Sequence, residues 1–285
     1  MEDIFEIVSK LKKENKEAFL ITVIKTKGTT SSRVGAKMVI LSDNTFFGTI
    51  GGGEVEFEIR NLISQGKIKK ATVMAFNLTP KKIEESEKGH EIINLNSMCS
   101  GYVELFVEPI HSEETLYIIG GGHCAVELSP LAQKCGFHVV VIDHRREWAS
   151  REKHPLAHQL IVANYEEVDK YIEFSQKSYV AVMTPRHEFD ELVISKLAGK
   201  NLKYLGFMGS PHKVKETFKH LMERGFKEEI LKKIYAPIGI SIKSNTPTEI
   251  AISIMAQILA IKNNLEEIEF SGNPLLKKKK NNILC

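Results

Sequence analysis

One stretch constrains the fold more than any other, a short apolar segment that runs directly into three consecutive glycines. Leu116 to Ile119 is apolar and partly β-branched, and Gly120, Gly121 and Gly122 follow at once. Apolar residues at helical spacing come next. About twenty residues after the glycines, a second apolar run ends at Asp143. Strand, glycines, helix, strand and acid in this order predict a βαβ unit of the dinucleotide-binding type.

Each feature of such a unit has a physical reason. Gly120 allows the tight turn, and Gly122 has no Cβ, so that a pyrophosphate can approach the backbone. Ala125 lets the helix lie close to the strand, and the helix N-terminus offers unpaired N–H groups to an anion. His123 either donates to a phosphate or simply occupies the turn. Asp143 is expected to accept a bond from a ribose 2′-OH, unless the fold is used without any ligand.

A second glycine run precedes another expected helix. Gly51, Gly52 and Gly53 form either a second anion or pterin site or only a turn into that helix. Lys37 either points at a phosphate or is a solvated lysine on a strand. Cys99 has small neighbours that leave its sulfur reachable, so it is either a reactive thiolate or a small buried residue.

Composition limits the classes of partner. The formal net charge is +3, and Lys277 to Lys280 supply four positive charges, so the rest of the chain is close to neutral. No aromatic residues interleave with this basic run, which predicts a solvated tail and no nucleic-acid partner. The longest apolar run, Ile250 to Ile261, is too short for a membrane span. Four cysteines without a C-x-x-C pair indicate neither a zinc site nor a disulfide framework, and the cytoplasm is the expected compartment.

The pattern as a whole predicts an α/β protein. An N-terminal α+β domain is expected over residues 1–110, a Rossmann-like domain with a parallel sheet over 115–268, and a basic disordered tail over 269–285. Helix starts are predicted at Ser210, before Pro211, and at Thr246, before Pro247. The last helix, to Lys262, is apolar on most faces, so we expect it to be buried and to form a homodimer interface. The expected helices lie within 3–19, 55–63, 126–132, 190–197 and 249–262, and the expected strands at 19–25, 37–41, 71–76, 101–107, 116–119, 139–142, 159–163, 178–183 and 203–208.

Several motifs together resemble one family along nearly the whole chain. They are Gly48 to Glu56, Met98 to Gly101, Leu116 to Ala125 and Tyr204 to Lys213. In this order and spacing they are similar to the XdhC/CoxI family, accessory proteins for molybdenum hydroxylases such as xanthine dehydrogenase. The chain departs from the family pattern at Thr184-Pro-Arg-His187, where the family has Thr-His-Asp-His, and at Ser241, where it has Asp.

The resemblance implies a non-enzymatic chaperone. Members of the family bind molybdenum cofactor, as molybdopterin or its dinucleotide form, and deliver it to the hydroxylase apoenzyme, often after a cysteine desulfurase has supplied a sulfur. The resemblance implies that Cys99 lies at the metal and that Gly209 and Ser210 contact the cofactor. Two alternatives remain: an NAD-dependent oxidoreductase, for which His187 and Asp190 are a loose acid–base pair, and a non-catalytic dinucleotide-binding sensor.

Overall fold

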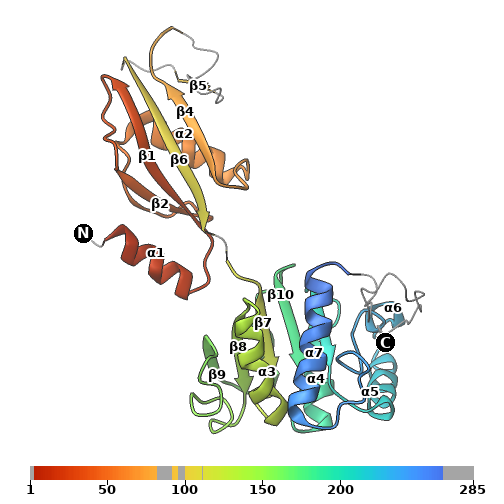
Figure 1. Ribbon diagram of the computed structural model, residues 1–285. Helices are drawn as coiled ribbons and strands as arrows, with labels where there is room; N and C mark the ends of the chain where they lie inside the picture. The colour runs from red at the N-terminus through yellow and green to blue at the C-terminus, as the bar shows by residue number, and fades with distance from the viewer. Residues whose placement is uncertain (1–2, 82–91, 96–99, 111, 266–285) are drawn as a thin grey trace, which may run out of the picture. The chain divides into compact units, whose positions relative to one another are not determined.

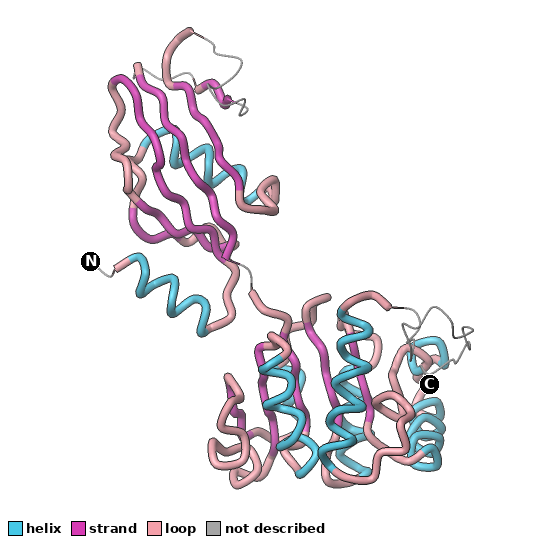
Figure 2. Tube along the Cα trace, in the orientation of Figure 1, coloured by secondary structure: helices cyan, strands magenta, loops and turns pink. Residues whose placement is uncertain are grey.

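The computed structural model describes residues 3–81, 92–95, 100–110 and 112–265. The chain divides into two compact units, residues 1–112 and residues 113–285 (Figures 1 and 2). The sequence placed the division between residues 110 and 115.

The first unit is built on a six-stranded sheet in the order β3-β2-β1-β6-β4-β5. Its neighbouring strands are antiparallel except for β4 and β5, which run parallel. The elements are α1 (Ile4–Lys13), β1 (Ala18–Gly28), β2 (Lys37–Leu41), β3 (Phe46–Gly48), α2 (Gly53–Ser64), β4 (Thr72–Asn77), β5 (Ile92–Asn94) and β6 (Gly101–Ile110).

The two helices of this unit pack against clusters from opposite faces of the sheet. Successive side chains of a strand point to opposite faces, so Met38 and Val39 belong to different cores. Met38 packs in the cluster that contains Ile59 of α2. Val39 packs with Ile7 and Leu11 of α1. The first unit is therefore an α+β domain with its main core between the sheet and α2.

The second unit has a five-stranded, fully parallel sheet in the order β11-β10-β7-β8-β9. The predicted fold class, α/β with a Rossmann domain, is confirmed. The elements are β7 (Thr115–Ile119), α3 (His123–Lys134), β8 (His138–Asp143), β9 (Gln159–Val162), the 3-10 helix η1 (Tyr165–Tyr171), β10 (Ser178–Val182), α4 (His187–Leu197), β11 (Tyr204–Phe207), α5 (Pro211–Glu223), α6 (Glu228–Leu231) and α7 (Pro247–Lys262).

Helices cover both faces of this sheet, and the central strands are accordingly rich in apolar residues that face both sides. Val139 and Val141 pack with α3 and α7 on one face, whereas Val140 and Ile142 pack with α4, α5 and η1 on the other. Strand β7 lies between β8 and β10, so the chain reverses its direction of travel across the sheet at this point (Figure 1). Ligands of such sheets bind outside the carboxyl ends of the strands at this switch point.

The predicted helix starts are confirmed. The Ser210 hydroxyl accepts a hydrogen bond from Lys213 N (3.2 Å) at the start of α5. Thr246 and Glu249 form a reciprocal capping box at the start of α7. Helix α4 begins at His187, before the expected start at Asp190.

Helix α1 (Ile4–Lys13) lies within the range 3–19 expected for a helix, and it ends before Asn15 with its φ of 53°. Other expectations were wrong in detail. Strand β3 lies in a segment expected to be a glycine-rich loop, and β5, η1 and α6 were not predicted, because short elements carry too few periods to recognise.

The helix expected to be a dimer interface is covered within its own domain. Helix α7 packs beside α3, and Ile254, Ile258 and Ala251 are buried in the same cluster as α3 and the sheet. Ile252 is half exposed. The expected tail lies outside the described residues. In the described part of the chain, no helix has the length and apolar character needed to cross a membrane.

Candidate functional site

The three glycines after β7 have different structural roles. Gly120 has φ of +101°, and a Cβ there would lie 2.4 Å from Met183 O. A Cβ on Gly121 would lie 2.6 Å from Trp148 O. The protein's own packing therefore requires the first two glycines. Gly122, the N-cap of α3, has an ordinary φ of −67°, and a Cβ there would meet nothing within 4 Å. A small side chain at position 122 would therefore enter unoccupied space.

Asp143 is a buried brace for this turn. Its Oδ2 accepts from Gly121 N (2.8 Å) and from Arg145 Nη2 (2.9 Å), and its Oδ1 accepts from Arg145 N (2.9 Å) and Nε (3.0 Å). Burial alone would raise the pKa of Asp143, but these hydrogen bonds outweigh it and lower the pKa. A carboxylate has about four lone-pair positions, and these bonds occupy them. The ribose contact predicted for Asp143 would require one of them to break.

Arg145, unlike the buried Asp143, carries a charge that is partly exposed to solvent. Two of its guanidinium nitrogens bind Asp143, which leaves further N–H groups on a side chain that is 27% exposed. Its guanidinium carbon lies 5.2 Å from the centre of the Trp148 ring. The same ring packs edge-on against His123, with 5.0 Å between centroids. The sequence reasoning missed Arg145 and Trp148, although Arg145 stands only two residues after the predicted acid.

His154 stabilises the turn through hydrogen bonds of both ring nitrogens. It is fully buried; its Nε2 lies 3.1 Å from Gly121 O and its Nδ1 lies 3.0 Å from Ser129 Oγ. Burial lowers the pKa of His154, so the ring is neutral, donates from Nε2 to the carbonyl and accepts from the serine. Only the fold brings this residue, 33 positions along the chain, to the turn.

The loop after β10 is held by a buried ion pair. Asp190 of α4 is fully buried, accepts from Thr184 N (3.1 Å) and Thr184 Oγ1 (2.6 Å), and pairs with Lys213 of α5. Burial raises the pKa of Asp190 against the opposing effect of Lys213 and Thr184. His187 instead contacts Thr217 Oγ1 (3.3 Å). The two residues of the expected acid–base pair thus have separate partners, which gives an oxidoreductase no support.

Gly209 and Ser210 start α5 beside this ion pair. A Cβ on Gly209 would lie 3.0 Å from Lys213 Cδ. The Ser210 hydroxyl is used as the helix cap. Ala125 is buried in the core next to the sheet, as close packing of α3 on the strand requires.

The glycine run of the first unit closes around a carboxylate. Gly51, Gly52 and Gly53 all have positive φ. The Oε1 atom of Glu56 accepts from Ile50 N (2.9 Å), Gly52 N (2.7 Å) and the Thr49 hydroxyl. Burial would raise the pKa of Glu56, but the hydrogen bonds lower it. Glu56 therefore occupies the N–H groups of Ile50 and Gly52, and the positive φ values account for glycine at the three positions.

Lys37 has a hydrogen-bond partner within the first unit. Lys37 Nζ donates to Thr22 Oγ1 (3.1 Å) at the start of β2 in the first unit. Cys99 lies outside the described residues. Cys124 and Cys135 are free thiols, and burial raises the pKa of Cys124, which fits the interpretation of Cys124 as a packing residue.

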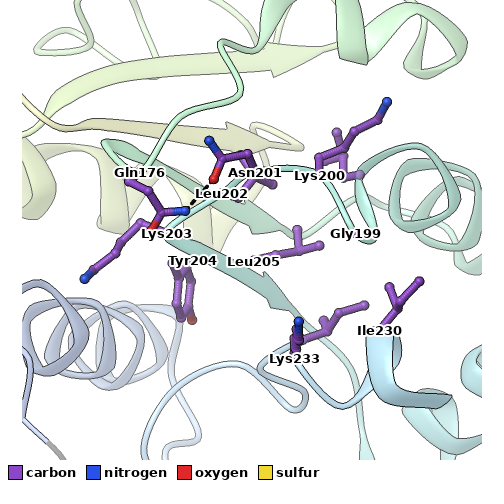
Figure 3. Close-up of a pocket in the computed structure, with 12 residues that line it drawn as sticks. Gln176, Gly199, Lys200, Asn201, Leu202, Lys203, Tyr204, Leu205, Ile230 and Lys233 are labelled. Atoms are coloured by element: carbon purple, nitrogen blue, oxygen red, sulfur yellow. Dashed lines mark hydrogen bonds between the residues drawn. The ribbon is translucent and has the colours of Figure 1, made fainter. Parts of the chain in front are cut away.

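A pocket of about 270 Å³ lies in the second unit (Figure 3). Its lining includes residues that precede β10 and β11, so it lies toward the amino edge of the sheet. Gln176 donates to Asn201 there (2.6 Å), and Lys200, Lys203 and Lys233 contribute to the lining. None of the predicted site residues lines it.

Known proteins are similar to this chain in both units. The family model described as the XdhC Rossmann domain matches residues 116–258, and that of the XdhC and CoxI family matches residues 11–66. YqeB of Escherichia coli (strain K12), described as uncharacterized, is 28% identical over 92% of this chain and 47% of its own length. A protein of Bacillus subtilis (strain 168), described as a probable subunit of xanthine dehydrogenase, is 31% identical over 54% of this chain and 45% of its own.

This chain thus spans less than half the length of both relatives. A solved structure described as a xanthine dehydrogenase from Bacillus halodurans matches 91% of this chain and 95% of its own, with 19% identity and a TM-score of 0.49. The match to the Rossmann-domain model covers half of the chain, and the second model covers part of the first unit. The chain therefore belongs to the XdhC and CoxI family.

Proposed function

We propose that this protein is an accessory protein of a molybdenum hydroxylase such as xanthine dehydrogenase. In this proposal it binds molybdenum cofactor, as molybdopterin or its dinucleotide form, at the turn after β7 and passes it to the hydroxylase apoenzyme. Family membership and the name of the Bacillus subtilis relative support the accessory role. The observation that supports this binding site is that a Cβ on Gly122 would meet no atom within 4 Å, so that the backbone there can be approached closely.

The chemistry of the turn suits a phosphate. The first turn of α3 contains no acidic residue, so its N–H groups and the positive end of the helix dipole meet no competing side chain there. Arg145 adds a guanidinium whose outward N–H groups match phosphate oxygens. The Asp143 carboxylate is turned inward and neutralised by Arg145, so it does not repel an anion. These features favour a phosphate-bearing cofactor over a ligand held only by its ribose.

Cys99 has a separate part in the proposal. A thiolate is a soft ligand that suits a sulfur-bound metal or carries a transferred sulfur. We assign that role to Cys99 on the family resemblance, with a cysteine desulfurase as the sulfur source and the cytoplasm, where thiols stay reduced, as the compartment.

The single tryptophan provides the test. Trp148 is the only tryptophan in the chain, and it contacts both His123 and Arg145. Ligand binding at the turn should therefore change its fluorescence. We expect anaerobic addition of molybdenum cofactor to give a saturable change, and Gly122→Val to abolish it while circular dichroism stays unchanged. Lys134→Val, at the far end of α3, is the matched control and should bind normally.

The same titration separates the alternatives. Saturable binding of NAD⁺ without binding of molybdenum cofactor would overturn the proposal in favour of a dinucleotide-dependent enzyme or sensor. Undiminished binding by a folded Gly122→Val variant would move the site away from the turn.

A homodimer is a further, independent part of the proposal. The apolar character of helix α7 favours it, but the packing of α7 against α3 weakens that support, and the half-exposed Ile252 remains. Sedimentation at micromolar concentration should show a species of twice 32.1 kDa. A monomer alone would end this part of the proposal.

A further inference from the structure

A second group of chemically active side chains lies at the opposite edge of the parallel sheet. Glu113 stands two residues before β7, His138 is the first residue of β8, and His158 comes directly before β9. Strands β7, β8 and β9 are parallel neighbours, so their starts meet at the amino edge. One ligand atom from each of the three side chains lies within 4.8 Å of the other two.

His138 is the unusual member of this group. Its side chain is buried, with 3% of the residue exposed, and its Nε2 atom has no hydrogen-bond partner among the described residues. Its ring lies against that of His158, with 4.3 Å between centroids. Buried polar atoms are rarely left unpaired, and a neutral imidazole nitrogen is a good metal ligand.

We propose that Glu113, His138 and His158 bind a zinc ion. Two imidazoles and one carboxylate form a mixed nitrogen and oxygen set that Zn²⁺ accepts readily, whereas Ca²⁺ and Mg²⁺ prefer oxygen ligands alone. Three protein ligands leave the fourth tetrahedral position to water. All three residues belong to the second unit, so the site does not depend on how the two units are arranged.

The hydrogen bonding of His158 gives the proposal a specific signature. In the ion-free protein, Nδ1 of His158 accepts from Val139 N (3.0 Å), so the ring proton is on Nε2. When Nε2 holds the ion, the ring proton moves to Nδ1, with no net proton released by this residue. Nδ1 then no longer accepts from Val139. Zinc binding should therefore release the Val139 amide and speed its exchange with solvent.

This site is separate from the proposed cofactor site. His138 and Asp143 are the first and last residues of β8, and five residues of strand span about 16 Å. A loss of zinc binding therefore leaves the fluorescence response of Trp148 to molybdenum cofactor intact, and a failure of cofactor binding leaves the zinc titration intact.

The test uses the full chain, freed of metal by a chelator and titrated with Zn²⁺ in a calorimeter. We expect one saturable site in the wild-type chain. Glu113→Gln and His158→Ala should weaken it by at least the roughly tenfold that even outer-shell partners contribute to metal affinity. His212→Ala is the matched control, because His212 also lies near a glutamate, Glu216 (3.8 Å), but on the exposed surface. It should bind zinc like the wild type.

Two spectroscopic measurements assign the ligands. Cobalt(II) in place of zinc should give the visible bands of a four-coordinate ion without the strong near-ultraviolet band of thiolate ligands, which would reveal binding by the cysteines instead. Amide exchange should become faster at Val139 when zinc is added. Absence of a saturable zinc site, equal affinity in Glu113→Gln and wild type, or a thiolate band would each overturn the proposal.

Discussion

The buried Asp143 carboxylate can be tested as a structural brace with one isosteric change. Asp143→Asn keeps the size of the side chain but removes its charge and turns one acceptor into a donor. The new NH₂ group would then face N–H groups of Arg145 or Gly121, which now donate to the two carboxylate oxygens. The variant therefore loses an ion pair and sets donors against each other.

The structure sets the size of the effect. Removing one partner of a buried ion pair costs about 3–5 kcal/mol. Arg145 is partly exposed, at 27%, so solvent will recover part of that cost, and we expect a loss of about 2–4 kcal/mol. For a unit of this size, each kcal/mol corresponds to roughly 2–4 °C in melting temperature. The expected fall is thus roughly 5–15 °C.

Denaturant unfolding followed by Trp148 fluorescence measures this loss in the second unit alone, because Trp148 is the only tryptophan. Glu228→Gln is the control: its ion pair with Lys232 (2.9 Å) is exposed, so this change should leave the free energy of unfolding nearly unchanged. The pKa of Asp143 is lowered by folding, so its contribution is present above the ordinary aspartate pKa near 3.9 and is lost only at lower pH.

The difference between wild type and Asp143→Asn should therefore stay constant from pH 7 to about pH 5 and shrink below about pH 4. Unchanged stability together with lost affinity for a nucleotide would refute this reasoning. That result would mean that the carboxylate serves a ribose instead.

Three further predictions concern the same domain. Gly120→Ala should strongly destabilise the second unit because its Cβ would meet Met183 O at 2.4 Å, whereas Gly122→Ala should leave the melting temperature nearly unchanged because its Cβ meets open space; equal effects would contradict the assigned roles. The pKa of His154 is lowered by burial, so below its ordinary value near 6.5 the unfolded chain takes up a proton that the folded chain does not. Between pH 7 and pH 5, the melting temperature of the wild type should then fall more than that of His154→Gln. An equal fall in both proteins would contradict this role of His154. Tyr204→Phe removes the hydrogen bond that the tyrosine hydroxyl donates to Gln257 (2.6 Å), while Gln257 still accepts from Gly239 N. This change should lower the free energy of unfolding by about 1 kcal/mol. Gln257→Leu leaves both buried donors without an acceptor and should lower it by more in the same unfolding assay.

Local patterns allowed the parallel sheet and its glycine turn to be predicted from the sequence. The apolar runs before Gly120 and Asp143 are continuous because both faces of the sheet are covered, and the turn follows from glycine's conformational freedom. The helix caps at Ser210 and Thr246 were predictable for the same reason, since their partners lie three residues away.

The partners of the site residues were not predictable, because they come from distant parts of the chain. His154 reaches Gly121 across 33 residues, and Lys213 reaches Asp190 across 23. No periodic pattern encodes such pairs. The role of Glu56 could have been predicted from the sequence, because it accepts a hydrogen bond from Gly52 N only four residues away. A glutamate at that spacing after a glycine run is a local signal that the turn supplies its own anion.

The ion pair between Asp190 and Lys213 makes two positions of the chain thermodynamically inseparable. Lys213→Met alone leaves a carboxylate in the core without its counter-charge, and Asp190→Leu alone leaves an ammonium beside an apolar side chain. The two changes made together remove both charges, so their combined cost should be well below the sum of the separate costs. Variation at one of these helix starts is therefore constrained by the other. Substitutions in the loop after β10 and in the first turn of α5 are therefore expected to depend on each other.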